Sequence, residues 1–228
     1  MKRLSPVFPN QGLIVSAQAL EDEPLHGGDT MAKMAIAARS AGAIGIRTNG
    51  VHDIRAIKAA VELPVIGLIK RTIPGSDVFI TPTAEEVAAI ADAGAEIVAM
   101  DATDREDRLG KVAELFALAH RRGMAVMADV STYEEGVAAA RLGADFVGTT
   151  LSGYTPYSAR QEGPDLELIR RLSADLDVPL VAEGRIWTPE EAVAALDAGA
   201  DYVVVGSAIT RPQLIAARYV AAIRRKLG

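Results

Sequence analysis

The sequence predicts an α/β protein with the TIM (β/α)8 barrel fold, formed as a single domain over residues 1–228. Three observations predict it: short apolar runs alternate with helical stretches, one segment recurs along the chain, and long loops lie on one side only. Strictly alternating strands and helices imply parallel strands joined by right-handed crossovers. Barrels of this kind commonly reach this length without splitting into domains.

The recurring segment carries most weight, because it marks repeated strand–helix units. Three copies begin at Thr83, Thr132 and Thr188, each with a glutamate three residues later and a Gly-Ala pair eleven residues after the threonine. Threonine and glutamate at this spacing form a capping box, and the glycine suits the left-handed residue after a helix. Residues 30–47 form a weaker fourth copy, with Gly42 as that glycine.

The predicted strands are short and apolar, as is typical of strands buried on both faces. We place them at residues 12–16, 44–47, 65–70, 97–101, 125–129, 146–149, 180–183 and 202–206. The helices between them lie at residues 31–40, 52–60, 83–93, 111–121, 132–141, 165–174, 188–197 and 214–226. An open doubly wound sheet is the alternative, but it explains the repeat less well. Long strand-to-helix loops at 17–28, 71–82 and 150–164 predict a functional site at the carboxyl ends of the strands.

Composition excludes several classes of function. The net charge of −6 argues against a general nucleic-acid binder, so any anion site must be local. No apolar run reaches the roughly 18 residues that span a bilayer, so we expect no membrane association. There is no cysteine, and Met1 is not followed by the apolar stretch of a signal peptide. We therefore expect a cytoplasmic protein.

Polar residues stand where the predicted strands end: Gln18, Arg47, Lys70, Asp101, Asp129, Thr149, Glu183 and the pair Gly206-Ser207. One polar strand end is commonly just solvated, as Asp101 or Thr149 would be. Several that converge, with cations and acids mixed, favour an active site. Three histidines, His26, His52 and His120, lie elsewhere and lack metal-ligand spacing. The three acids could hold Mg²⁺, but the interleaved cations favour a site without metal.

Lys70 is the most specific candidate for a catalytic residue. It follows the apolar run VIGLI, and the aliphatic part of its side chain is therefore expected to be buried. Desolvation and a nearby Arg47 or Arg71 would lower its pKa and make it a base. Alternatively, it neutralises a substrate phosphate or pairs with Asp101. After the seventh and eighth strands come Glu183-Gly184-Arg185 and the loop GSAITRP, residues 206–212. Barrels often bind phosphate there, and Arg185 or Arg211 could add a charged hydrogen bond.

Motifs across the chain are recognisable together: GLIVSAQALEDEPLH, GIRTNG, PVIGLIKR, DVFITPT, DATDR, MADVST, DFVGTTLSGYT, AEGRIWTPEEA and VVVGSAITRPQ. The sequence resembles the N-acylglucosamine-6-phosphate 2-epimerases, the N-acetylmannosamine-6-phosphate epimerases of sialic acid breakdown. The resemblance implies a barrel without cofactor that interconverts N-acetylmannosamine-6-phosphate and N-acetylglucosamine-6-phosphate. It implies catalytic roles for Lys70 and Glu183. It also implies sugar contacts at Gln18, Arg47 and Asp129, and phosphate contacts near Gly184, Gly206, Ser207 and Arg211.

The chemistry requires removal of the C2 proton, which is α to the open-chain aldehyde, and its return from the other face. We expect Lys70 to transfer that proton. Glu183 either acts opposite it or opens the ring and orients the sugar. Two other classes stay open: a Schiff-base aldolase using the same lysine, and a catalytically silent sugar-phosphate sensor. The apolar helix at 214–223 suggests a homodimer.

Overall fold

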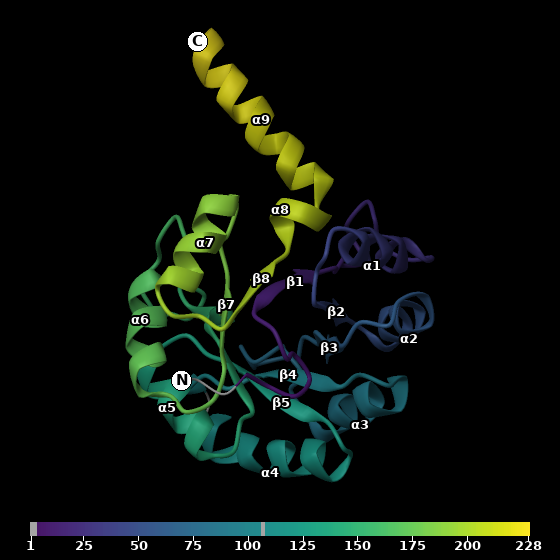
Figure 1. Ribbon diagram of the computed structural model, residues 1–228, viewed down its shortest axis with the longest axis vertical. Coiled ribbons are helices and arrows are strands. Elements are labelled where there is room, and N and C mark those ends of the chain that lie inside the picture. Colours follow the sequence, from purple (N-terminus) through teal and green to yellow (C-terminus); the bar gives the residue numbers. More distant parts are fainter. Residues whose placement is uncertain (1–3, 106–107) are drawn as a thin grey trace.

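The computed structural model describes residues 4–105 and 108–228, and it confirms the predicted barrel. Eight parallel strands pair in sequence order, and β8 pairs with β1 to close the sheet. The strands are β1 Gly12–Ser16, β2 Gly45–Asn49, β3 Val65–Leu68, β4 Ile97–Asp101, β5 Ala125–Asp129, β6 Phe146–Gly148, β7 Leu180–Glu183 and β8 Tyr202–Val205. Figure 1 shows the strands at the centre and the helices around them.

The helices are α1 Thr30–Ser40, α2 Val51–Ala60, α3 Ala84–Ala93, α4 Arg108–Arg121, α5 Tyr133–Arg141, α6 Leu166–Asp175, α7 Pro189–Asp197, α8 Ser207–Thr210 and α9 Pro212–Leu227. The three predicted capping boxes are present at the starts of α3, α5 and α7. The four predicted glycines all have positive φ, between 90° at Gly94 and 106° at Gly199. The repeat therefore marks real strand–helix units.

The amino-terminal segment closes the lower end of the barrel. The Phe8 ring packs against Phe146 and Tyr202, with ring centroids 6.0 and 5.3 Å away, and these two residues begin β6 and β8. The Tyr202 hydroxyl donates to the carbonyl of Phe8 at 2.7 Å. Because this end is filled with aromatic side chains, access to the barrel interior is left to the opposite rim.

Four predicted strand ends differ at that rim, the eighth by a single residue, because β8 ends at Val205 and not at Gly206. Arg47 lies in the middle of β2, which runs on to Asn49, and not at its end. β3 ends at Leu68, and Lys70 instead forms an isolated antiparallel bridge with Ile80 of the following loop. β6 ends at Gly148, because the chain turns into a 3₁₀ helix at Thr149. Gly148 lies close to the barrel interior, and a Cβ there would lie 2.4 Å from Met127 Cε, so that the methionine side chain would have to move.

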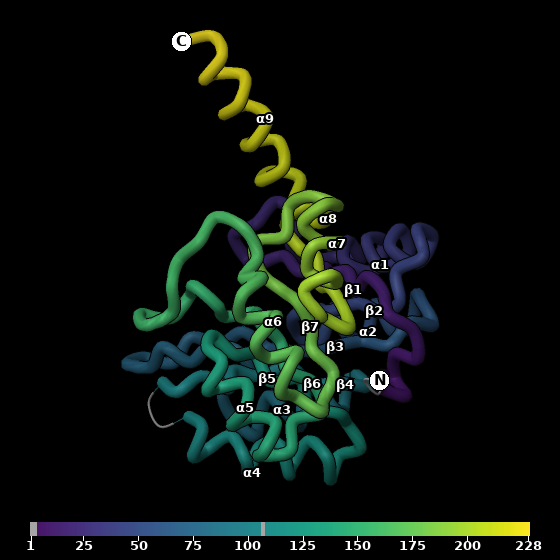
Figure 2. Tube along the Cα trace, turned by 60° about the vertical axis from the view of Figure 1, so that its left-hand side comes forward, coloured from purple at the N-terminus to yellow at the C-terminus, as the bar shows by residue number. Residues whose placement is uncertain are grey.

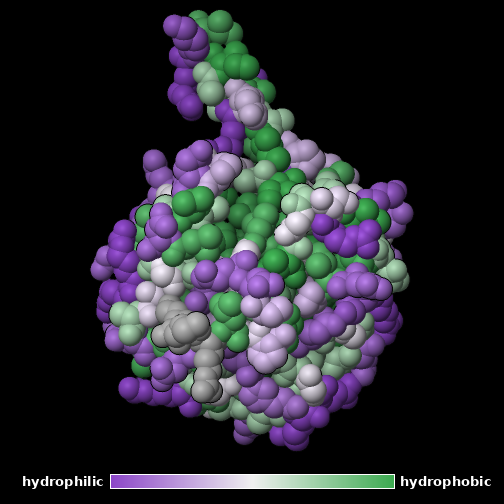
Figure 3. All heavy atoms as spheres, in the orientation of Figure 1, coloured by the Kyte–Doolittle hydropathy of each residue, from purple (hydrophilic) through white to green (hydrophobic). Residues whose placement is uncertain are grey.

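The last helix, α9, stands away from the barrel. In Figures 1 and 2 it extends outward from the short α8, so that the carboxyl terminus points into solvent. None of its residues is buried by the described part of the chain. Figure 3 shows hydrophobic side chains gathered on the body of the molecule below the root of this helix. Among the described residues no helix is long and apolar enough to cross a membrane.

Candidate active site

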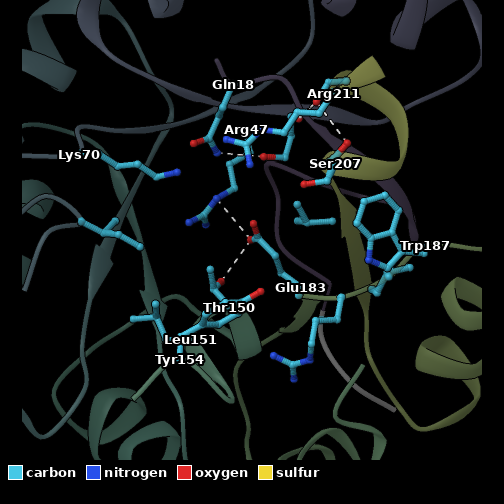
Figure 4. A pocket seen from close by; sticks show the side chains of 18 of the residues that line it. Gln18, Arg47, Lys70, Thr150, Leu151, Tyr154, Glu183, Trp187, Ser207 and Arg211 are labelled. Atoms are coloured by element: carbon cyan, nitrogen blue, oxygen red, sulfur yellow. Dashed lines mark hydrogen bonds and ion pairs between the residues drawn. The ribbon is translucent and has the colours of Figure 1, made fainter. Parts of the chain in front are cut away.

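A cavity of about 430 Å³ opens at the carboxyl ends of the strands. Its wall comes from β1, β2, the β3–α3 loop, the segment after β6, the β7–α7 loop and α8 (Figure 4). The predicted residues that line it are Gln18, Arg47, Lys70, Glu183, Gly184, Arg185, Gly206, Ser207 and Arg211. Thus residues from distant parts of the sequence converge on one cavity, as their strand-end positions predicted.

Arg47 is the central charge of the cavity. Only 1% of its side chain is exposed, and its guanidinium binds both carboxylate oxygens of Asp129, at 3.1 and 2.6 Å. Its Nε lies 3.3 Å from Glu183 Oε2 without the geometry of a hydrogen bond. A buried guanidinium requires such counter-charges, because desolvation of an unpaired ion is costly. Burial opposes its charge, but the two carboxylates outweigh burial and raise the pKa of Arg47.

Asp129 therefore lies beneath the cavity and not in its wall. It ends β5, is fully buried, and is absent from the residues that line the cavity. Its carboxylate is occupied by Arg47 and by the Thr150 hydroxyl, which lies 2.6 Å from Oδ1. The structure thus places Asp129 behind Arg47, where it holds that side chain in position.

Glu183 stands at the end of β7 with its carboxyl group in the cavity. The Thr149 hydroxyl fixes its backbone on both sides, accepting from Glu183 N–H at 3.1 Å and donating to its carbonyl at 3.0 Å. Burial raises the pKa of Glu183 to about 7; the charge of Asp129 adds to this, and the charge of Arg47 opposes it. At neutral pH this carboxyl group can therefore give or take a proton.

Lys70 reaches the cavity from the opposite side (Figure 4). Its backbone N–H donates to Asn49 Oδ1 at 2.8 Å, and the bridge to Ile80 fixes the chain around it. Within the described residues its amine has no hydrogen-bond or ion-pair partner. Burial, and then the charges of Arg47 and Arg211, lower the pKa of Lys70 to about 8. An amine with this pKa is a usable base near neutral pH.

The upper end of the cavity is formed by Gly184, Arg185 and the start of α8. Gly184 has φ of 109° and Arg185 has φ of 57°, so the chain turns sharply after Glu183 while it still lines the cavity. Gly206 packs against β1, since a Cβ there would lie 3.2 Å from that of Ser16. Small residues and the first amides of a helix leave room for an anion.

The two arginines predicted for phosphate differ in their contacts. Arg185 binds backbone carbonyls of the β6–α6 loop, Gly163 at 2.9 Å and Ser152 at a short distance. Arg211 pairs with Glu23 through one guanidinium nitrogen, at 2.8 Å, and lines the cavity. The other carboxylate oxygen of Glu23 accepts a hydrogen bond from the side-chain amide of Gln213. Arg185 therefore stabilises a loop, and Arg211 has the freer guanidinium.

Gln18 contributes an unsatisfied acceptor. Its amide nitrogen donates to Ser16 Oγ at 2.9 Å, whereas Oε1 is buried and has no partner among the described residues. A buried acceptor without a donor is costly unless a ligand supplies one. The amide oxygen is therefore suited to a hydroxyl or N–H group of a bound molecule.

Sequence reasoning missed part of the wall: Ser16, Phe79, Ile80, Thr150, Leu151, Tyr154, Ile186, Trp187, Val204 and Thr210. Ser16 could have been found by alternation, being two residues before Gln18 in an extended chain. Thr150 could not, because the 3₁₀ turn after β6 breaks that alternation. A neighbouring recess between the β1–α1 and β2–α2 loops is larger, about 800 Å³, but of the predicted residues only Lys70 reaches it.

Asp101, named as a strand end, does not reach the cavity. It is fully buried and bonds Thr103 at 2.7 Å and Arg105 at 2.5 Å, outside the cavity wall. It therefore does not pair with Lys70. Across residues 4–105 and 108–228, no three His, Asp or Glu side chains gather as metal ligands.

Comparison with known proteins agrees with this geometry. Residues 31–225 match the sequence model of the family described as "Putative N-acetylmannosamine-6-phosphate epimerase". The chain is 56% identical to a "Putative N-acetylmannosamine-6-phosphate 2-epimerase" of Caldanaerobacter subterraneus, covering 94% of this chain and 92% of that one. A protein of the same description from Clostridioides difficile is 50% identical, with 92% and 95% covered. The solved structure of N-acetylmannosamine-6-phosphate 2-epimerase from Clostridium perfringens superposes with a TM-score of 0.90 at 48% identity, covering 95% and 94%.

Proposed function

Because the chain belongs to the N-acetylmannosamine-6-phosphate epimerase family, we propose that its rim cavity inverts C2 of that sugar phosphate. The protein is an epimerase, and inversion at C2 converts N-acetylmannosamine-6-phosphate into N-acetylglucosamine-6-phosphate, a step that fits sialic acid breakdown. The C2 proton of the open-chain sugar is acidic because it is α to the aldehyde. Its removal gives an enolate, and a proton returned to the other face completes the inversion.

One observation carries the mechanism: an amine and a carboxyl group with neighbouring pKa values lie on opposite sides of one cavity. Lys70 follows β3 and Glu183 ends β7, four strands apart in the closed ring of eight. Their pKa values are about 8 and about 7. A sugar bound between them presents one face of C2 to each, which is the geometry that two-sided proton transfer requires.

The proton count works in both directions. Neutral Lys70 removes the C2 proton, and protonated Glu183 supplies a proton to the opposite face. The pair then holds its one proton on Lys70, which is the state that starts the reverse reaction. Because the two pKa values are close to each other and to neutral pH, both of these protonation states of the pair are accessible. Such a small difference suits a reversible epimerase.

The remaining contacts follow from the wall of the cavity. We assign the phosphate to the backbone of Gly184, Gly206 and Ser207 with the guanidinium of Arg211, since this end combines small residues with positive charge. The sugar itself lies toward Gln18 and Arg47. Asp129 acts through Arg47, which it holds in place by two hydrogen bonds. No cofactor or metal is needed for this proton transfer.

Proton NMR of N-acetylmannosamine-6-phosphate with the enzyme in D₂O tests the enolate. We expect the product to carry deuterium at C2 and at no other carbon. Lys70→Ala should abolish inversion and exchange together, whereas Glu183→Gln should exchange deuterium into unreacted substrate without inverting it. Epimerised product that retains protium at C2 would refute the enolate.

Two alternatives predict different results. An aldolase would form an imine at Lys70, and borohydride would then trap substrate covalently on that residue. A sugar-phosphate sensor would bind the substrate without exchange at C2, and binding would survive Glu183→Gln. We expect that borohydride traps no sugar on Lys70, and that bound substrate does exchange its C2 proton. Since phosphorylated sugars are made and consumed inside cells, we propose a cytoplasmic location.

We also propose that the enzyme is a homodimer in which α9 of each copy covers the other. Among the described helices, the four-residue α8 is the one that follows β8 directly and lies over this side of the barrel, and α9 stands clear of the body. Val193 of α7 and Ile36 of α1 are 56% and 40% exposed beside this region. On α9, Val220 and Ile223 are 45% and 57% exposed. Two apolar surfaces left uncovered in one chain support mutual burial between two chains.

Light scattering after gel filtration tests the dimer. Ile223→Asp should shift the protein toward monomer, because it buries a carboxylate in the proposed interface. Arg225→Asp is the matched control, since it lies about 200° around the helix and introduces the same side chain. A monomeric wild type, or equal effects of both variants, would contradict the proposed interface.

A further inference from the structure

The hydroxyl group of Thr150 contacts two carboxyl groups, that of Asp129 and that of Glu183. Thr150 Oγ1 lies 2.6 Å from Asp129 Oδ1 and 3.2 Å from Glu183 Oε2. Figure 4 shows Thr150 on one side of Glu183 and Arg47 on the other. The second neighbour of the same Oε2 atom is the Nε of Arg47, at 3.3 Å. One oxygen of Glu183 thus has two different partners.

The Thr150 hydroxyl has one hydrogen to donate and lone pairs to accept with. That hydrogen is better placed for Asp129, whose Oδ1 is fully buried and lies 2.6 Å from Thr150 Oγ1, against 3.2 Å for Glu183 Oε2. Toward Glu183 the hydroxyl can then only accept. Only the protonated form of Glu183 has a hydrogen to give it. If Glu183 were ionised, its carboxylate oxygen would face a lone pair of the Thr150 hydroxyl, and the two would repel each other.

Arg47 offers the opposite partner. Its Nε–H is buried and has no hydrogen-bond acceptor among the described residues, although both outer nitrogens of its guanidinium face Asp129. An ionised carboxylate is the acceptor that this donor lacks. A small movement of Glu183 toward Arg47 would satisfy Nε at the expense of the contact with Thr150.

We propose that Thr150 and the Nε of Arg47 form a two-position cradle for Glu183, in which the threonine holds the neutral acid and the arginine holds the carboxylate. Thr150 is then a positioning residue for the epimerase mechanism proposed above, on which this inference rests. When Glu183 gives its proton to the enolate, the contact with Thr150 loses its hydrogen and the Arg47 Nε–H bond forms. The reverse reaction restores the first position.

The other groups around Glu183 leave this pair as its local partners. The charged side chains that face it are Arg47 from β2, Asp129 from β5 and Lys70 beyond β3. On β8 its neighbour is the uncharged Val204. Thr150 Oγ1 is also within reach to donate to Glu183 Oε2, and a threonine that donated there would lower the carboxyl pKa. Its one hydrogen cannot serve both carboxyl groups, and the shorter contact with Asp129 favours a threonine that accepts from Glu183, which raises this pKa. The two arrangements therefore differ in sign, which makes them separable.

The test is a titration of the Glu183 carboxyl group by ¹³C NMR in substrate-free protein, with the signal assigned from Glu183→Gln. Thr150→Val removes the hydroxyl at nearly constant volume, and the pKa of Glu183 should fall by about one unit. Thr150→Ser restores a hydroxyl and should return the pKa to the wild-type value. If Thr150→Val does not fold, Thr150→Ala removes the same group and the same fall is expected.

The matched control is Thr103→Val, which deletes a buried hydroxyl bonded to an aspartate, Asp101, at 2.7 Å but outside the cavity. It should leave the pKa of Glu183 unchanged. A rise or no change in Thr150→Val and Thr150→Ala would overturn the cradle. Because no substrate is present, this outcome is independent of the deuterium experiment, so failure of the enolate mechanism and failure of the cradle are distinguishable.

Discussion

Replacing Lys70 by methionine should abolish activity and at the same time stabilise the fold. Burial and the neighbouring positive charges lower the pKa of Lys70 from 10.5 to about 8, so the charged amine is less stable here than in the unfolded chain. This difference corresponds to at most about 3 kcal/mol at pH 7. The amine faces an open cavity where solvent screens it, so we expect a gain of about 1–2 kcal/mol from methionine, which keeps the apolar stem.

Urea unfolding at several pH values measures this gain. Below pH 8 the amine is charged in both states and the full gain is present. Above pH 8 the folded wild type loses its proton while the unfolded chain keeps it, so wild-type stability rises and the gain shrinks toward pH 10.5. Lys58→Met is the control, because Lys58 pairs with Glu96 near the surface. A Lys70→Met protein that is less stable than wild type at pH 7, or a gain independent of pH, would refute the argument.

Three further predictions concern the charges of the site. The pH profile of kcat/KM should be bell-shaped, with limbs near 7 from Glu183 and near 8 from Lys70, because the active pair shares one proton; a flat profile from pH 6 to 9 would exclude these assignments. Asp129→Asn should lower the free energy of unfolding by about 2–4 kcal/mol in urea titrations, since it strips a counter-charge from buried Arg47; a cost near zero would show that the ion pair is dispensable. Arg211→Ala should raise KM about tenfold with little change in kcat in initial-rate assays, because the phosphate charge is the same in ground and transition states; an unchanged KM would assign the phosphate to other groups.

The sequence was sufficient for the barrel, because capping boxes and Gly-Ala pairs repeat at positions that only regular strand–helix units explain. The sequence also predicted that Lys70 and Glu183 lie at the same end of the barrel, where the strands terminate. It did not show that Asp129 lies below the cavity, since the layer of an inward side chain depends on the register between strands. Nor did it indicate Thr150, whose orientation follows from a 3₁₀ turn that no periodic pattern marks.

The last helix shows another limit of the sequence. The apolar residues along α9 predicted a helix with a surface to bury, and a helix is present at Pro212–Leu227. Its direction relative to the barrel was not predictable, because a helical pattern is the same whether its partner is in the same chain or in another. The chain leaves α8 at Arg211, and the backbone there sets the direction.

The three capping boxes also bear on how the chain folds. Each box closes within four residues, from the threonine to its glutamate, and therefore needs no distant part of the chain. Contacts between residues close in sequence form within microseconds, whereas joining the first strand to the eighth requires almost the whole chain. Helices α3, α5 and α7 can thus start at fixed residues early in folding. The loop that carries Glu183, Gly184 and Arg185 is then bounded by a set helix start before the ring of strands closes.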